Sequence, residues 1–135
     1  MVIAVSHEIV SPRDTASGQA TGKRIHKPLV ITKELDKSSP VLYASMVNNE
    51  TINEFELQFF KPKLAVGGAG LEVNHYRIRL TNAQINDIRF TMLNTKNPEL
   101  VKYAEYEEVS FSYEKIEWTW IDGGIEAADD WEAED

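Results

Sequence analysis

Histidines are the side chains of this sequence that most readily take part in chemistry. His7, His26 and His75 lie in three separate segments of alternating polar and apolar residues, and three converging imidazoles can hold a zinc ion. However, their spacing matches no common zinc-ligand pattern, and His26 lies among cations that repel a metal ion. The sequence therefore predicts no metal site and no cofactor.

Acidic pairs are the second candidate for chemistry. A glycosidase-type site needs two carboxyl groups in one pocket with separated pKa values. The spacing of Glu54 and Glu56 is explained by alternation along the solvated face of a strand, so it does not indicate a pocket. The sequence indicates no pocket at Glu107 and Glu108 either. The sequence has no cysteine, no serine in a Gly-x-Ser-x-Gly turn and no phosphate-binding loop. We therefore predict no catalytic residues and no enzyme activity.

Charge falls into two opposite blocks. The net charge is −8, and seven acidic residues without a basic one lie in an acidic C-terminal tail, residues 122–135, which leaves −1 for the rest. Residues 13–28 carry a net charge of +3. Opposite blocks are often interaction tails and their targets. The predicted interface residues are Arg13, Lys23, Arg24, His26 and Lys27 in the basic loop, and Asp129, Asp130 and Trp131 in the tail.

The basic loop is interpreted as a protein-binding element. Nucleic-acid binding needs a basic face, often with aromatic stacking platforms, whereas this loop has no aromatic residue and the whole chain is acidic, so we predict no nucleic-acid partner. In the tail, Trp131 among carboxylates is typical of an interface anchor. Two alternatives stay open: the charged ends are solvated and never meet, and Trp131 folds back on its own domain.

Length and composition indicate one globular domain, residues 1–135. A chain of 135 residues with 42% hydrophobic and 27% charged residues is typical of a soluble protein with one core. No apolar run approaches the roughly 18 residues that span a bilayer. The first five residues also lack the features of a secretory signal. We predict no membrane insertion, no signal peptide and synthesis in the cytosol.

Alternation of apolar and polar residues predicts a mainly β fold with antiparallel strands. The pattern covers residues 1–10, 25–35, 52–60 and 72–80. The apolar residues change from odd-numbered to even-numbered positions after Ile85 and again after Tyr113. Each of these parity reversals predicts a bulge or a corner between packed layers. The expected architecture is an antiparallel two-sheet β-barrel or sandwich with one flanking α-helix.

The flanking helix is expected after Ser39. Ser39 is a suitable cap and Pro40 a suitable first-turn residue, and the helix should end at Asn48-Asn49. Its predicted apolar stripe is Leu42, Tyr43, Met46 and Val47. A further helical turn is expected within residues 97–106.

Three runs of the sequence resemble a known family: "TGKRIHKPLVITKELDKSSPVLYASMVNNETINEFELQFFKP", "YRIRLTNAQINDIRF" and "VSFSYEKIEWTWIDGGIEAADDWEAE". They are similar to Hcp, the haemolysin-coregulated protein family (TssD) of type VI secretion systems, over about residues 6–134. The most specific motifs are G-K-R-x-H-K-P, K-E-L-D-K-S-S-P-x-L-Y, Y-E-K-I-x-W-T and the D-D-W tail. The resemblance implies a β-barrel like that of phage tail tubes.

The resemblance also implies a function and partners. Family members assemble into hexameric rings that stack into a hollow inner tube, which a contracting sheath expels and in which effector proteins travel. The partners implied are identical copies, the sheath, the spike, the baseplate and effector cargo, with assembly in the cytoplasm followed by secretion. The family uses the loop at residues 11–28 to reach neighbouring subunits or rings. We expect the basic loop of one ring to face carboxylates of the next.

One departure and one alternative accompany the resemblance. Family members usually begin with two further strands ahead of residues 2–9, so the closure of the barrel is in question. The alternative function is a monomeric β-barrel that binds a small ligand in its interior. Bulky side chains favour a filled interior instead: Phe55, Leu57, Phe59, Phe111 and Trp118.

Overall fold

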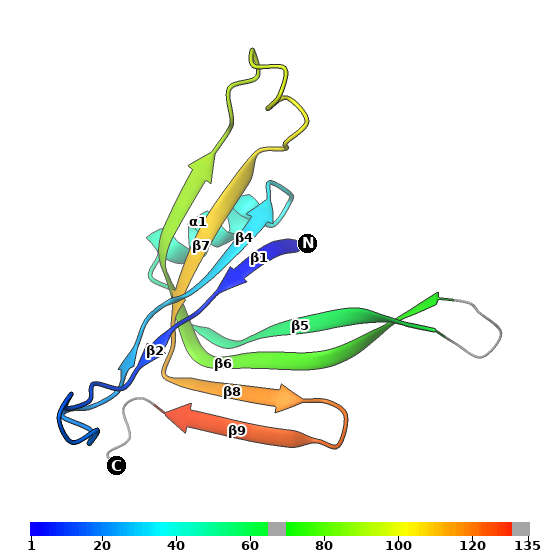
Figure 1. The fold of residues 1–135 in the computed structure, drawn as a ribbon. Coiled ribbons are helices and arrows are strands. Elements are labelled where there is room, and N and C mark those ends of the chain that lie inside the picture. The colour runs from blue at the N-terminus through cyan, green and yellow to red at the C-terminus, as the bar shows by residue number, and fades with distance from the viewer. Residues whose placement is uncertain (65–69, 131–135) are drawn as a thin grey trace. The chain divides into compact units, whose positions relative to one another are not determined.

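The protein is mainly β with antiparallel strands, as predicted, and the residues that the structure describes contain one α-helix (Figure 1). A computed structural model describes residues 1–64 and 70–130. The chain divides into two compact units. Unit 1 comprises residues 1–51 and 84–112, and unit 2 comprises residues 52–83 and 113–135.

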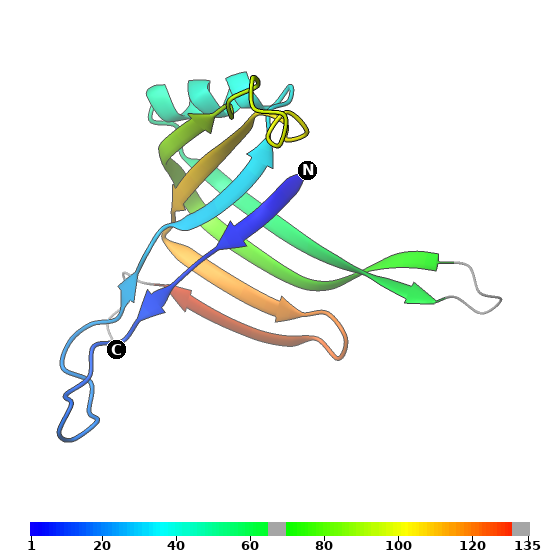
Figure 2. The same ribbon diagram turned by 45° about the horizontal axis from the view of Figure 1, so that its top comes forward.

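Unit 1 contains a sheet, a short hairpin and the helix. The sheet has the antiparallel order β1 (Val2–Ser6), β4 (Leu29–Glu34), β7 (Tyr106–Ser112) and residues 84–91 of the long strand β6 (Gly70–Thr91). The hairpin consists of β2 (Ile9–Val10) and β3 (Ile25–His26), and α1 spans Ser39–Val47. Figure 2 shows β1 and β4 side by side, with the hairpin continuing from their ends.

Alternation along β4 and β7 builds the core of unit 1. Every second residue of these strands is buried, and residues directly opposite each other share a face. Leu29 pairs with Phe111 and Ile31 with Val109, and all four side chains are almost completely buried. The predicted alternation of residues 25–35 is therefore confirmed for β4.

A buried ion pair continues the same face beyond the apolar residues. Lys33 lies directly opposite Glu107, and its Nζ is 2.7 Å from Glu107 Oε1. Burial opposes the charge of Lys33, but hydrogen bonds to Glu107 and Asp36 outweigh it and raise the pKa of the ammonium group. The Ser39 hydroxyl donates to the same Glu107 oxygen at 2.8 Å, so the pair ties the start of α1 to the sheet.

The structure corrects the prediction that Ser39 caps the helix. Ser38 occupies the N-cap position without a side-chain capping bond, and Ser39 is a buried first residue that contacts Lys33 and Glu107. Pro40 lies in the first turn and Asn48 is the C-cap, both as predicted. The predicted apolar stripe is only partly buried: Leu42 and Met46 are half-buried, whereas the other two residues, Tyr43 and Val47, are exposed.

Unit 2 is a four-stranded antiparallel sheet in the order β5 (Ile52–Leu64), residues 70–83 of β6, β8 (Lys115–Trp120) and β9 (Ile125–Asp130). Its apolar face contains cross-strand pairs such as Leu57 and Ile78. On the polar face Arg79 lies 2.7 Å from Glu54 and 3.6 Å from Glu117. The predicted alternation of residues 52–60 is confirmed.

The two predicted parity reversals coincide with breaks in strand geometry. In β6 the pairing register shifts between Ile85 and Asp87, which is the expected bulge. The second reversal falls between strands, because β7 ends at Ser112 and β8 begins at Lys115. A further helical turn is not found in residues 97–106, where successive turns with bonds such as Leu100 N to Asn97 O replace it.

Asn82 marks the point where β6 passes from unit 2 to unit 1. Its φ of 51° is left-handed, a conformation that asparagine tolerates better than most residues. Its side-chain amide donates to Glu114 Oε2 at 2.7 Å, and the Glu114 amide donates to Thr81 O at 3.1 Å. Asn82 and Glu114 therefore hold this corner together.

Replacing one member of the buried ion pair should destabilise the fold strongly. Lys33→Met leaves the Glu107 carboxylate buried without its cation, which costs about 3–5 kcal/mol. Urea denaturation should show that loss for Lys33→Met, little change for the exposed control Lys37→Met, and recovery of most of it in Lys33→Met with Glu107→Leu. If Lys33→Met alone were as stable as the wild type, the ion pair would have no role in stability.

Asn82 offers a test of the corner. Asn82→Ala should lose about 1–2 kcal/mol, because alanine resists a left-handed φ and cannot bond Glu114. Asn82→Gly loses the bond but accepts the φ, so its unfolding free energy should lie between those of alanine and wild type. Equal stability of the glycine and alanine variants would show that backbone conformation contributes nothing there.

Candidate interface on the β2–β3 hairpin

The predicted basic loop is an ordered hairpin rather than a loose connection. β2 and β3 pair through Ile9 with His26 and Val10 with Ile25, and an isolated bridge joins Arg13 to Ala20 nearer the tip. The Thr21 amide also donates to Pro12 O at 2.9 Å. Figure 2 shows this hairpin as the dark to light blue segment that extends from β1 and β4.

Asp14 organises the hairpin tip. Its carboxylate accepts hydrogen bonds from the Ala16 amide and the Ser17 hydroxyl, both at 3.0 Å, and its carbonyl accepts one from the Gly18 amide at 2.7 Å. These bonds to Ala16 and Ser17 lower the pKa of Asp14. Gly18 adopts a φ of 74°, which glycine accepts without strain. An aspartate before small residues is a turn signal that the sequence reading did not use.

The predicted cationic residues differ in accessibility. Arg13 and Lys23 are exposed near the tip, whereas Arg24 and His26 are half-buried closer to the root. Lys27 is exposed, but its Nζ lies 3.2 Å from Glu8 Oε2 within the same hairpin. Arg13 and Lys23 are therefore the two positions best placed to meet another molecule.

The predicted acidic residues lie partly in a strand. Asp129 and Asp130 are the last residues of β9, half-buried, opposite Ile116 and Lys115 of β8. Burial, and then the charge of Asp129, raise the pKa of Tyr113. The segment treated as a tail thus begins with an edge strand of unit 2. Trp131 lies outside the described residues.

The three candidate histidines are divided between the two units. His7 and His26 lie in unit 1 near the hairpin root, and His75 lies on β6 in unit 2. Burial, followed by the nearby charge of His26, lowers the pKa of His7. Among the described residues, no group of three or more metal-ligating side chains could hold a metal ion.

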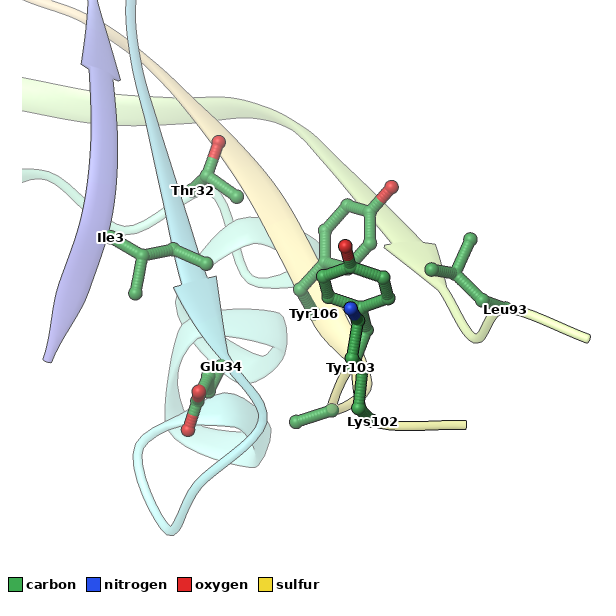
Figure 3. A pocket seen from close by; sticks show the side chains of 8 residues that line it. Ile3, Thr32, Glu34, Leu93, Lys102, Tyr103 and Tyr106 are labelled. Atoms are coloured by element: carbon green, nitrogen blue, oxygen red, sulfur yellow. The ribbon is translucent and has the colours of Figure 1, made fainter. Parts of the chain in front are cut away.

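A surface groove in unit 1 provides a second candidate site (Figure 3). The groove has a volume of about 290 Å³ and is mostly apolar, with Ile3 on one side, Leu93 on the other, and Tyr103 and Tyr106 between them. Glu34 is the single carboxylate among its lining residues, so it lacks the paired carboxyl groups of a glycosidase. No sequence signal indicated this groove.

The described part of the chain has no helix long and apolar enough to cross a membrane. α1, with nine residues, is far shorter than the roughly 20 residues that a spanning helix needs.

Comparison with known proteins identifies relatives over almost the full chain. The family described as "Type VI secretion system effector, Hcp" matches residues 1–120. The "Major exported protein" of Pseudomonas aeruginosa PAO1 is 40% identical over 131 residues, which cover 97% of this chain and 74% of that protein.

Solved structures agree with the sequence match. The Hcp1 protein from the E. coli EAEC 042 pathovar has a TM-score of 0.78 at 34% identity, over 96% of this chain and 79% of that one. The secreted protein Hcp3 from Pseudomonas aeruginosa has a TM-score of 0.71 at 33% identity, over 97% of this chain and 74% of that one.

The role of Asp14 can be tested by hydrogen exchange. Asp14→Ala removes both carboxylate bonds, so the Gly18 and Thr21 amides should exchange several-fold faster while the urea midpoint stays unchanged, because the tip opens locally. Thr15→Ala, an exposed change in the same turn, is the matched control. Equal exchange in the two variants would show that Asp14 does not order the tip.

Proposed function

The chain belongs to the Hcp family of type VI secretion proteins, and from this premise we propose that it is a tube subunit, forming hexameric rings that stack into a hollow tube for effectors. The family consists of secreted structural proteins and supports a role in the secretion tube. The single observation that carries the proposal is the match of the family model to residues 1–120.

The charge distribution supports contacts between copies. The basic hairpin presents Arg13 and Lys23 in exposed positions, and the acidic residues cluster at the other end of the sequence, including Asp129 and Asp130. Two patches of opposite charge on the same protein favour a heterologous contact, which repeats from subunit to subunit. In the proposed tube, the hairpin of one ring faces carboxylates of the next, with Trp131 as an aromatic anchor.

Order in the hairpin also supports a docking role. The Asp14 bonds fix the tip before any partner arrives, so less conformational entropy is lost on docking. Lys27 contributes less than Arg13 and Lys23 to such a contact, because it already pairs with Glu8. Arg24 and His26 then support the root of the hairpin.

The remaining partners are proposals that rest on family membership. The sheath, the spike, the baseplate and effector cargo are the partners of a secretion tube, with assembly in the cytoplasm before secretion. We also propose that residues 1–135 act as a single domain, which a single cooperative unfolding transition would support. The alternative of a monomeric ligand-binding barrel has less support, because the Figure 3 groove is a surface feature.

Imaging and sedimentation test the tube proposal. Negative-stain images should show rings, and stacked rings should dissociate between about 0.1 M and about 1 M salt, over which the Debye length falls from about 10 Å to about 3 Å. Arg13→Glu with Lys23→Glu should prevent stacking at low salt, because like charges then face each other.

Lys96→Glu with Lys102→Glu is the matched control, since both lysines are exposed in unit 1 outside the hairpin. The control should stack like the wild type. A protein that stays monomeric at high concentration would refute the tube role. Rings that stack equally well at both salt concentrations and in the variant with Arg13→Glu and Lys23→Glu would refute the charge contact but not the tube role.

A further inference from the structure

The groove of Figure 3 and the basic hairpin lie at opposite ends of the β1–β4 pair. The two strands are antiparallel, and Val2 of β1 is opposite Lys33 of β4. Ile3 and Glu34, which line the groove, are the next residues along these strands. The hairpin continues instead from Ser6, the other end of β1, and returns to the start of β4 (Figure 2).

This placement means that a contact between hairpin and groove joins different copies of the chain. The six residues of β4, at about 3.3 Å each, separate the two features within one copy. Both ribbon views show the hairpin extending away from the N-terminal end of β1 (Figure 1, Figure 2). A contact of one end with the opposite end of another copy is heterologous, so it repeats in one direction from copy to copy.

The lining of the groove fits a side chain with an apolar stem and a flat cationic head. Figure 3 shows the rings of Tyr103 and Tyr106 between Ile3 and Leu93, with Glu34 on the β4 side. Glu34 is exposed, so its carboxylate is accessible to a partner. An arginine combines the required properties, because its stem packs on apolar surface while its guanidinium stacks on aromatic rings and pairs with carboxylates.

Lys102 shows that a cation already lies on one of these rings. Its Nζ is 5.4 Å from the centroid of the Tyr103 ring and lies over the ring face. Lys102 is exposed and belongs to the same loop as Tyr103, so this contact joins nothing outside the loop. An arriving arginine therefore competes with Lys102 for the ring. Lys102→Glu removes the competitor and does not oppose docking.

Arg13 is the residue of the hairpin that matches the groove. It is exposed, and its bridge to Ala20 fixes its backbone beside the tip that Asp14 orders. Little backbone entropy is therefore lost when its side chain docks. Lys23 is also exposed, but its compact, strongly hydrated ammonium group lacks the planar face that stacks on a tyrosine ring.

We propose that Arg13 of one copy inserts into the Figure 3 groove of a copy in the next ring, where its guanidinium pairs with Glu34 and stacks on a tyrosine ring. The proposal rests on the proposed tube function and names the surface that receives the hairpin. The groove is then the receiving half of a head-to-tail contact whose other half is the hairpin tip.

Cross-linking between single-cysteine variants tests this contact. The sequence has no cysteine, so each variant carries one thiol. A mixture of Arg13→Cys and Glu34→Cys, treated with a short bismaleimide, should give a dimer that contains one chain of each variant by mass spectrometry. Each variant alone should give no such product. A cross-linker is needed because a direct disulfide requires Cα atoms within about 7 Å, closer than an arginine–glutamate pair requires.

Two further mixtures define the specificity. Glu50→Cys replaces Glu34→Cys as the matched control, since Glu50 is an exposed glutamate of unit 1 that does not line the groove. As much product with Glu50→Cys as with Glu34→Cys would overturn the proposal. In the other mixture Trp131→Cys replaces Arg13→Cys. Product with Trp131→Cys and none with Arg13→Cys would show that the C-terminal segment occupies the groove, which would also overturn it.

Charge reversal measures the same contact without a cross-linker. Arg13→Glu and Glu34→Arg should each raise the protein concentration at which rings stack several-fold, and the two changes together should restore stacking, because opposite charges face each other again. Arg13→Glu with Glu50→Arg should not restore it. Tyr103→Ala should weaken stacking, whereas Tyr103→Phe, which keeps the ring, should not. A double reversal that stacks no better than Arg13→Glu would contradict the contact.

Imaging of the same mixtures separates this contact from the tube role. Rings that stack while Arg13→Cys and Glu34→Cys give no product would overturn the contact and leave the tube role standing. A specific product without rings at any concentration would refute the tube role and support the head-to-tail contact. If neither rings nor product form, both proposals fail.

Discussion

Strand β6 imposes the main constraint on this fold, because one continuous strand serves both units. Its residues 70–83 pair with β5 and β8, and residues 84–91 pair with β7. Each half must present apolar residues to the core of its own unit, so the alternation cannot keep one phase over 22 residues. The left-handed Asn82 and the bulge between Ile85 and Asp87 provide the necessary changes of phase.

The same constraint determines how the following strands pair. β7 and β8 both pair with β6 but belong to different units, so the chain must turn between Ser112 and Lys115. Glu114 lies in that turn and bonds to both Asn82 and the backbone of Thr81. One set of polar contacts therefore secures both the point at which β6 changes units and the connection between β7 and β8.

Local patterns predicted the strands better than the polar contacts between them. Alternation repeats every two residues within a single strand, so it can be recognised without knowing the neighbouring strand. The strand around Leu57 and the bulge near Ile85 could therefore be predicted. Lys33 shares the parity of Leu29 and Ile31, yet its partner Glu107 is 74 residues away, and only the β4–β7 register brings the two together.

The helix start and the candidate interface show the same limit. Ser39 fits a capping pattern, but the buried Glu107 recruits its hydroxyl and moves the cap to Ser38. The charges of Arg13 and Lys23 were visible in the sequence. In contrast, the order of the tip depends on Asp14, and the exposure of each cation depends on the register of the hairpin. The strand β9 within the acidic segment was missed because its residues do not alternate in hydrophobicity.

Weak contacts suffice for a docking hairpin in a symmetric assembly. An exposed ion pair contributes only about 0–1 kcal/mol and is screened by salt, so Arg13 or Lys23 alone would hold no partner. In the proposed ring each contact is repeated by every subunit, and linked contacts reach high avidity without strong individual bonds. The order that Asp14 gives the tip matters more under these conditions, because any entropy lost on docking would be repeated in every subunit as well.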